Sequence, residues 1–221
     1  MDKQKLRAVI FDLDGTLLDT VQDIGAGANT ALHRSGLPEH SREEYVQLVG
    51  HGIRRLMSLA VPEGIDDAVL EEALAFYLSY YPAHCTEKTD YFPGVQTMLH
   101  KLEAAGYKLG VLSNKTEKTA IKIIDHYFPD LNWQLVWGNN GVRPLKPALD
   151  AGYLLCDELG LAPEQILYVG DGDTDMEFAS KMGFAAAAAT WGYRSREQLR
   201  AAGAEIYLES AEDILHLLDL A

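Results

Sequence analysis

Cysteine is scarce in this 221-residue sequence, which has only Cys85 and Cys156, and their separation fits no metal-binding or redox motif. Two free thiols are typical of a protein in a reducing cytoplasm. Long hydrophobic runs are lacking as well. The apolar run near the N-terminus is too short for a signal peptide or a membrane span, and it lacks a small-residue cleavage site. We therefore expect a cytoplasmic protein without a membrane partner.

Basic residues are also few, with 19 Lys and Arg against 33 Asp and Glu, which gives a formal net charge of −14. This balance is the opposite of the basic surface that nucleic acid or an anionic membrane requires, so neither is expected as a partner. An acidic surface also repels anionic substrates. A site for phosphate would therefore need a bound metal and a few cations to reverse the charge locally.

Short apolar runs that end in small or polar residues recur along the chain, at residues 7–12, 108–113, 135–138 and 166–170. Helical patterns lie between them, and this alternation is typical of βα units that build a parallel sheet. The five alanines at 185–189 are interpreted as a further strand of small residues that is tightly covered. The sequence thus predicts an α/β fold with a Rossmann-like, doubly wound parallel sheet.

The strand signal disappears between Thr20 and about Thr86, where apolar residues follow a helical period instead. Pro93 and Gly94 mark the return to the α/β pattern. The predicted organisation is a core domain of residues 1–19 and 87–221, with an inserted all-helical domain at residues 20–86. We expect Asp19 to cap the first helix of this inserted domain and Asp23 to lie on the solvated face of that helix. Later in the chain, Pro147 is expected in the first turn of a helix that runs to Glu158.

Polar residues follow the predicted strands where each strand ends. In order, they are Asp12 and Asp14, Ser113 and Asn114, Lys146, and then Asp171, Asp173 and Asp175. Carboxylates gathered at one sheet edge repel each other unless a cation joins them, and oxygen ligands of this kind suit Mg²⁺. Beside such a cation Asp12 is a competent nucleophile toward phosphorus, and Asp14 is placed to act as acid and base. Lys146 and Ser113 can stabilise the charge on the phosphoryl oxygens.

Four of these segments resemble the motifs of the haloacid dehalogenase superfamily, in its phosphatase branch. The first motif, DxDGT, matches residues 12–16 without a gap, and the second, a Ser or Thr at a strand end, matches Ser113. The third, a Lys usually followed by Pro, matches Lys146 and Pro147. The fourth, GDxxxD, matches residues 170–175. The motifs follow in the correct order between residue 7 and about residue 195.

The resemblance implies roles for the matched residues and Mg²⁺ as the cofactor. Asp12 would be the nucleophile and a metal ligand, and Asp14 would be the acid and base that also binds metal through its backbone carbonyl. Asp171 would be the third protein ligand, and Asp175 would bind through water or orient the others. Thr16 and Asn114 are expected to contact the substrate or its phosphate.

The helical insertion resembles a C1 cap, which closes over the active site and selects the substrate. Within it, glycines flank His51 and two cations follow, so His51, Arg54 and Arg55 are candidates for substrate binding, with an arginine holding a carboxylate. The alternative is a flexible turn followed by a helix whose arginines face solvent. This stretch and residues 190–197 resemble the phosphoglycolate phosphatase subgroup, which implies a small phosphorylated metabolite as the substrate.

Several alternatives remain open within the same fold: a pyrophosphatase, a sugar-phosphate phosphatase and a β-phosphoglucomutase-like mutase. A phosphonoacetaldehyde hydrolase is disfavoured because it needs a cap lysine, and the chain has no lysine between Lys5 and Lys88. A true dehalogenase lacks the second aspartate of the first motif, so the presence of Asp14 argues against that activity. A catalytically silent binding protein would be expected to have lost at least one of four residues, and none is lost: Asp12, Asp14, Lys146 and Asp171. Both a monomer and a homodimer are compatible with the sequence.

Overall fold

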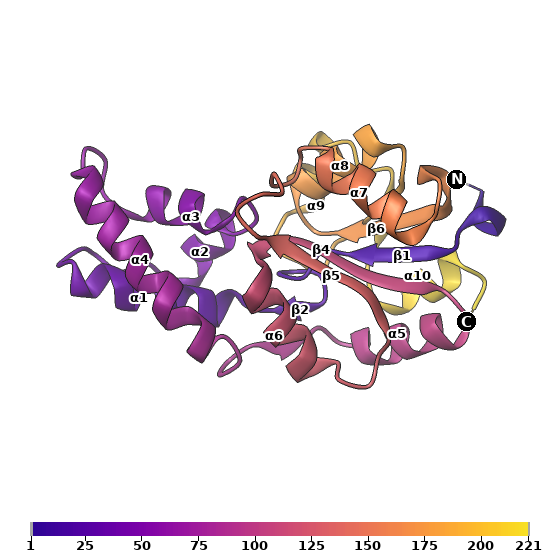
Figure 1. The fold of residues 1–221 in the computed structure, drawn as a ribbon, viewed down its shortest axis with the longest axis horizontal. Coiled ribbons are helices and arrows are strands. Elements are labelled where there is room, and N and C mark those ends of the chain that lie inside the picture. Colours follow the sequence, from indigo (N-terminus) through magenta and orange to yellow (C-terminus); the bar gives the residue numbers. More distant parts are fainter. Residues whose placement is uncertain (1, 221) are drawn as a thin grey trace.

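The computed structural model of the protein describes residues 2–220, whose main body is a six-stranded sheet in the order β5-β4-β1-β6-β7-β8 (Figure 1). The strands are β1 (Ala8–Phe11), β4 (Lys108–Thr116), β5 (Trp133–Asn139), β6 (Ile166–Gly170), β7 (Ala185–Ala189) and β8 (Ile206–Leu208). Every neighbouring pair is parallel. The predicted parallel sheet is confirmed, including the run of five alanines, which forms β7 between β6 and β8.

Helices cover both faces of this sheet, and the alternation along β1 shows how. Val9 and Phe11 belong to a buried apolar cluster with α5 (Val95–Ala104), α6 (Glu117–Tyr127) and α10 (Glu212–Leu217). Ala8 and Ile10 point to the opposite face, where they pack with α7 (Asp150–Leu159) and α8 (Asp173–Met182). The described chain also contains α9 (Arg196–Ala201) and short 3₁₀ helices at Lys3–Lys5 and Pro163–Gln165. A strand that is apolar on both sides is what a doubly wound sheet requires.

Four further helices lie beyond one end of the sheet, on the left in Figure 1: α1 (Val21–Arg34), α2 (Arg42–Leu48), α3 (Ile53–Ala60) and α4 (Asp67–His84). The apolar face of α1, which includes Ile24 and Leu32, is buried and packs with Tyr77 and Tyr81 of α4, as the helical period of the sequence predicts. The chain leaves the sheet region through β2 (Leu18–Asp19) and returns through β3 (Asp90–Tyr91), and these two strands pair antiparallel. No helix of residues 2–220 has the length and apolar character of a membrane span.

The interpretation of two aspartates beside this connection was wrong. Asp23 is not on a solvated face, because it is buried and accepts hydrogen bonds from the backbone N–H groups of Lys88 and Thr89 and from the Thr89 hydroxyl, at 2.8–3.0 Å. Asp19 does not cap α1, since its carboxylate accepts from the Tyr193 hydroxyl at 3.1 Å and from Arg42 at 2.8 Å. Asp23 thus holds the chain segment that returns to the sheet at Lys88 and Thr89, and Asp19 contacts Arg42 and Tyr193.

The helix predicted to start at Pro147 begins three residues later, at Asp150, and Pro147 lies in the preceding turn. It ends at Leu159, one residue after the predicted end at Glu158, where Gly160 takes the left-handed conformation at the C-cap with φ +63°. Lys146 therefore lies in the connection between β5 and α7, at the edge of the sheet.

Candidate active site

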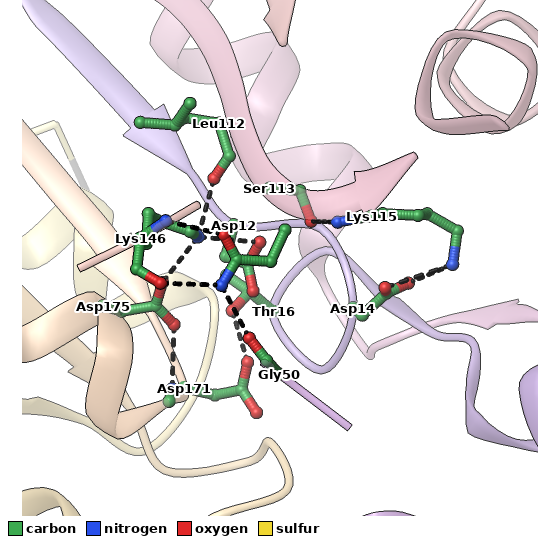
Figure 2. Close-up of polar contacts among 12 residues, drawn as sticks. Asp12, Asp14, Thr16, Gly50, Leu112, Ser113, Lys115, Lys146, Asp171 and Asp175 are labelled. Carbon is green, nitrogen blue, oxygen red and sulfur yellow. Dashed lines mark hydrogen bonds and ion pairs between the residues drawn. The ribbon is translucent and has the colours of Figure 1, made fainter. Parts of the chain in front are cut away.

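Three carboxylates and one lysine gather at the carboxyl edge of the central strands (Figure 2). Asp12 follows β1, and Asp171 follows the neighbouring strand β6. Asp175 lies in the first turn of α8, where its Oδ2 accepts a hydrogen bond from the backbone N–H of Gly172 at 2.9 Å. Parallel strands end at one edge of the sheet, so the fold brings together residues that are more than 150 positions apart.

Lys146 lies at the centre of this group and is buried. Its Nζ is 2.7 Å from Asp175 Oδ1 and 3.1 Å from Asp12 Oδ1, and it donates hydrogen bonds to the Leu112 carbonyl and the Tyr168 hydroxyl. Burial by itself lowers the pKa of Lys146, but the charges of Asp12 and Asp175 outweigh it and hold the pKa well above its ordinary value. Lys146 is therefore a permanent cation beside Asp12.

The carboxylates have too little positive charge around them. Burial raises the pKa of Asp12 to about 6, with Lys146 opposing the rise and Asp175 and Asp14 adding to it. Burial also raises the pKa of Asp171 to about 8, and repulsion by Asp175 and Asp12 adds to that shift. Hydrogen bonds from the backbone N–H of Tyr193 and the Thr16 hydroxyl, both at 2.8 Å, only partly offset it. Such a group is stabilised by an additional cation.

The same residues fit a divalent metal ion. Asp12, Asp171 and Asp175 each present one oxygen, and the three oxygens lie within 4.8 Å of one another. Asp12 Oδ1 is buried and forms an ion pair with Lys146 at 3.1 Å, but it accepts no hydrogen bond of favourable geometry from the described residues, so it retains capacity to bind a metal ion. A side chain at Gly15 or Gly192 would overlap the Asp171 carboxylate, so these two glycines make the space that it occupies. An all-oxygen set of this kind suits a hard cation such as Mg²⁺.

Asp14 does not face this group. Figure 2 shows its carboxylate turned toward Lys115, whose Nζ donates to Oδ1 at 2.8 Å and to Oδ2 at 3.1 Å. The Thr20 hydroxyl also donates to Asp14 Oδ1, at 2.6 Å. Sequence reasoning did not select Lys115, although it directly follows Ser113 and Asn114 in the chain. Its position after a motif serine was the signal that could have identified it.

Two other motif residues join segments that are distant in the chain. The Asn114 amide donates to the carbonyls of Gly50 at 2.8 Å and Lys146 at 3.1 Å, and its Oδ1 accepts from the Lys146 N–H. The Thr16 hydroxyl donates to Asp171 Oδ1, so Thr16 supports a candidate metal ligand. Ser113 Oγ accepts from the Lys115 N–H at 3.3 Å.

A cavity opens above Asp12, between the sheet edge and the helices α1, α3 and α4. Of the predicted site residues, Asp12, Asp14, Ser113 and Asn114 line it. Ile24, Ile53 and Leu56 give it an apolar side, and Tyr77, Tyr81 and Lys115, which the sequence did not single out, also line it.

The residues of the helical insertion that were predicted to bind substrate do not line this cavity. Arg54 is 66% exposed and forms a bidentate pair with Glu71 at 2.5 and 2.8 Å, and Arg55 is exposed as well. His51 Nε2 lies 3.3 Å from Asp173 Oδ2, at a surface groove on another side of the 49–52 turn. The structure therefore does not bring His51, Arg54 or Arg55 to the cavity above Asp12, and the arginines follow the solvent-facing alternative.

This combination of a doubly wound sheet and a buried carboxylate group at its carboxyl edge defines an α/β enzyme with a helical cover over its site. The chain belongs to the haloacid dehalogenase-like hydrolase family, whose model matches residues 9–189. The motif resemblance of the sequence is thereby confirmed.

Similar proteins and solved structures indicate which kind of hydrolase the chain is. A phosphoglycolate phosphatase of Xanthomonas campestris pv. campestris is 35% identical over 192 residues, which is 85% of each chain. An N-acetylmuramic acid 6-phosphate phosphatase of Pseudomonas aeruginosa is 30% identical and covers 100% of this chain and 98% of its own. The crystal structure of a predicted phosphoglycolate phosphatase from Haemophilus somnus has a TM-score of 0.90 at 27% identity, over 96% and 98% of the two chains. The protein is a phosphatase of this family.

Proposed function

We propose that the protein is a Mg²⁺-dependent phosphatase that hydrolyses a small phosphomonoester through an aspartyl-phosphate on Asp12. The observation that carries this proposal is the position of Asp12, which belongs both to the buried carboxylate group and to the lining of the cavity. Among the described residues, Asp12 is the carboxylate common to both, so a substrate in the cavity meets a nucleophile that can also contact the cation.

The reaction has two steps in this proposal. An Asp12 oxygen attacks phosphorus, the bond from phosphorus to the ester oxygen breaks, and the departing oxygen takes a proton from Asp14. Water then attacks phosphorus and gives a proton to Asp14, and the bond to Asp12 breaks, which releases inorganic phosphate and restores both carboxyl groups. Ser113 and Lys146 stabilise the negative charge of the phosphoryl oxygens.

Asp12, Asp171 and Asp175, with the backbone carbonyl of Asp14, are proposed to hold the Mg²⁺. The cation would neutralise the carboxylates and the phosphate and so allow two anions to approach each other. Asp175 already accepts from Lys146 and from the Gly172 N–H, which suits an orienting role or binding through water.

Residues 20–86 are proposed to form a cap domain on a core of residues 1–19 and 87–221. Contacts between the two parts support it: Arg194 donates to the carbonyls of Val46 and Val49 at 2.7 and 2.6 Å, and Asn114 donates to that of Gly50. A cap in this position would exclude water from the cavity while the phosphoryl group is transferred.

The proposed substrate is 2-phosphoglycolate, because relatives with that name match most of the chain. The Pseudomonas relative favours a phosphorylated sugar acid as the second candidate. Because the described thiols of Cys85 and Cys156 are both free, the proposed site of action is the reducing cytoplasm.

The proposal is tested by phosphate release from p-nitrophenyl phosphate, 2-phosphoglycolate, N-acetylmuramic acid 6-phosphate, pyrophosphate and hexose phosphates, with Mg²⁺ or with EDTA. We expect turnover that EDTA abolishes and that falls about 10⁴-fold or more in Asp12→Asn, since an amide is no nucleophile. Turnover that survives EDTA or this substitution would overturn the mechanism. A hexose phosphate or pyrophosphate as the best substrate would overturn the substrate assignment alone.

A further inference from the structure

Lys115 is the single cation among the described residues that line the cavity. Its side chain is only 5% exposed, and it comes from the carboxyl end of β4, on the same wall as Ser113. The other lysine of the site, Lys146, is occupied by Asp12, Asp175, the Leu112 carbonyl and the Tyr168 hydroxyl. An anionic group that enters the cavity beside the phosphate therefore meets Lys115.

Tyr81 of α4 supplies a second donor near Lys115. The Lys115 ammonium lies 4.8 Å from the centre of the Tyr81 ring, and both residues line the cavity. The Tyr81 hydroxyl is buried and has no hydrogen-bond partner among the described residues. Burial raises the pKa of Tyr81 well above its usual value, and the Asp14 charge adds to the rise, so the hydroxyl keeps its proton. A buried donor without an acceptor is costly unless a ligand provides one.

The partner of Lys115 in this structure is Asp14, the residue that the proposed mechanism needs beside the leaving group. A buried ammonium without a counter-ion would be strongly unfavourable, so Asp14 must stay with Lys115 until another anion replaces it. The Thr20 hydroxyl holds Asp14 on the same side. A substrate without a second anionic group offers no such replacement.

Resting on the proposed function, we propose that Lys115 and the Tyr81 hydroxyl form a subsite for a carboxylate on the leaving group of the substrate. Binding of that carboxylate takes Lys115 from Asp14 and frees Asp14 to turn toward the ester oxygen. The substrate class is then a small phosphate ester whose leaving group is a 2-hydroxy acid or a similar short acid. Recognition comes from the core strand β4 and from α4, not from the exposed arginines of α3.

The test compares 2-phosphoglycolate with 2-hydroxyethyl phosphate, which has a neutral hydroxymethyl group in place of the carboxylate. Binding of both ligands with Mg²⁺ is measured by calorimetry on Asp12→Asn, so that it does not depend on turnover. The same background then receives Lys115→Met or Tyr81→Phe. Lys118→Met, an exposed lysine on the adjacent helix, and Tyr80→Phe, outside the cavity lining, are the matched controls.

We expect Lys115→Met to weaken binding of 2-phosphoglycolate about 100-fold and Tyr81→Phe about 10-fold, while 2-hydroxyethyl phosphate changes less than about threefold. The controls should change neither ligand. Equal losses for both ligands in Lys115→Met, or no loss for either, would overturn the subsite and leave Lys115 as a positioning residue for Asp14.

Turnover of the two ligands by the otherwise unmodified enzyme separates this inference from the proposed function. Hydrolysis of 2-phosphoglycolate with unchanged selectivity in Lys115→Met overturns only the subsite. Selective, Lys115-dependent binding without hydrolysis by the unmodified enzyme overturns only the proposed function.

Discussion

The Lys146 ammonium lies 3.1 Å from Asp12 Oδ1, although the two residues are 134 positions apart in the chain. The same ammonium lies 2.7 Å from Asp175 Oδ1, so one buried cation serves two buried carboxylates. This arrangement leaves the site with net negative charge and makes each of its members dependent on the others. The predictions below use that dependence.

Removing the Lys146 charge should damage both stability and activity. Lys146→Met leaves Asp12 and Asp175 buried without their partner, so we expect a loss of about 3–5 kcal/mol in the free energy of unfolding. Phosphatase activity should fall about 10³-fold, because charge stabilisation at the phosphoryl group is lost. Urea titration and initial rates measure the two effects. Lys181→Met, which breaks an exposed pair with Glu177, should cost less than about 1 kcal/mol.

Without metal, stability should decrease as the pH rises. The pKa of Asp171 is raised from 3.8 to about 8 in the folded protein, so the folded state binds more protons than the unfolded state between these values. The free energy of unfolding therefore falls as the pH increases through this window. In EDTA, the melting temperature should be lower at pH 8 than at pH 5.5, and Mg²⁺ should reverse the difference. Asp171→Asn should weaken this pH dependence; an unchanged dependence would contradict the assignment to Asp171.

The space that Gly15 leaves for Asp171 should strengthen metal binding. Gly15 has φ +87°, and an added side chain would displace the Asp171 carboxylate. Gly36 has φ +68° with open space around it, so Gly36→Ala carries the same left-handed cost of about 1–2 kcal/mol without the displacement. Calorimetry should find Mg²⁺ affinity about 10- to 100-fold weaker in Gly15→Ala and unchanged in Gly36→Ala.

Arg54 should have little effect on turnover. Its guanidinium is paired with Glu71 on the exposed side of α3, away from the cavity. We expect Arg54→Ala and Glu71→Ala each to leave kcat/KM within about twofold and to leave stability nearly unchanged, because the pair is exposed to solvent. A selective rise of KM for an anionic substrate in Arg54→Ala alone would restore the substrate contact that the sequence suggested.

Asp23 should contribute more to stability than an aspartate on a helix surface. Asp23→Ala leaves the buried N–H and hydroxyl groups at Lys88 and Thr89 without their acceptor, so a loss of about 2–4 kcal/mol is expected. Asp125→Ala, at an exposed position of α6, is the control and should be close to neutral. A difference between the two variants below the error of a thermal melt would contradict this role of Asp23.

The sequence alone determined the sheet and the residues at its carboxyl edge. Strand and helix periods are local properties, and parallel strands necessarily end at one edge, so Asp12, Lys146 and Asp171 could be placed together without coordinates. The tertiary structure decided which way the remaining side chains point. Whether Tyr81 or Arg54 reaches the cavity depends on how α4 and α3 pack, and Asp23 is buried because the returning chain crosses it. Asp14 meets Lys115 because the segment after β1 and the carboxyl end of the neighbouring strand β4 lie side by side, and no local sequence pattern relates these two positions.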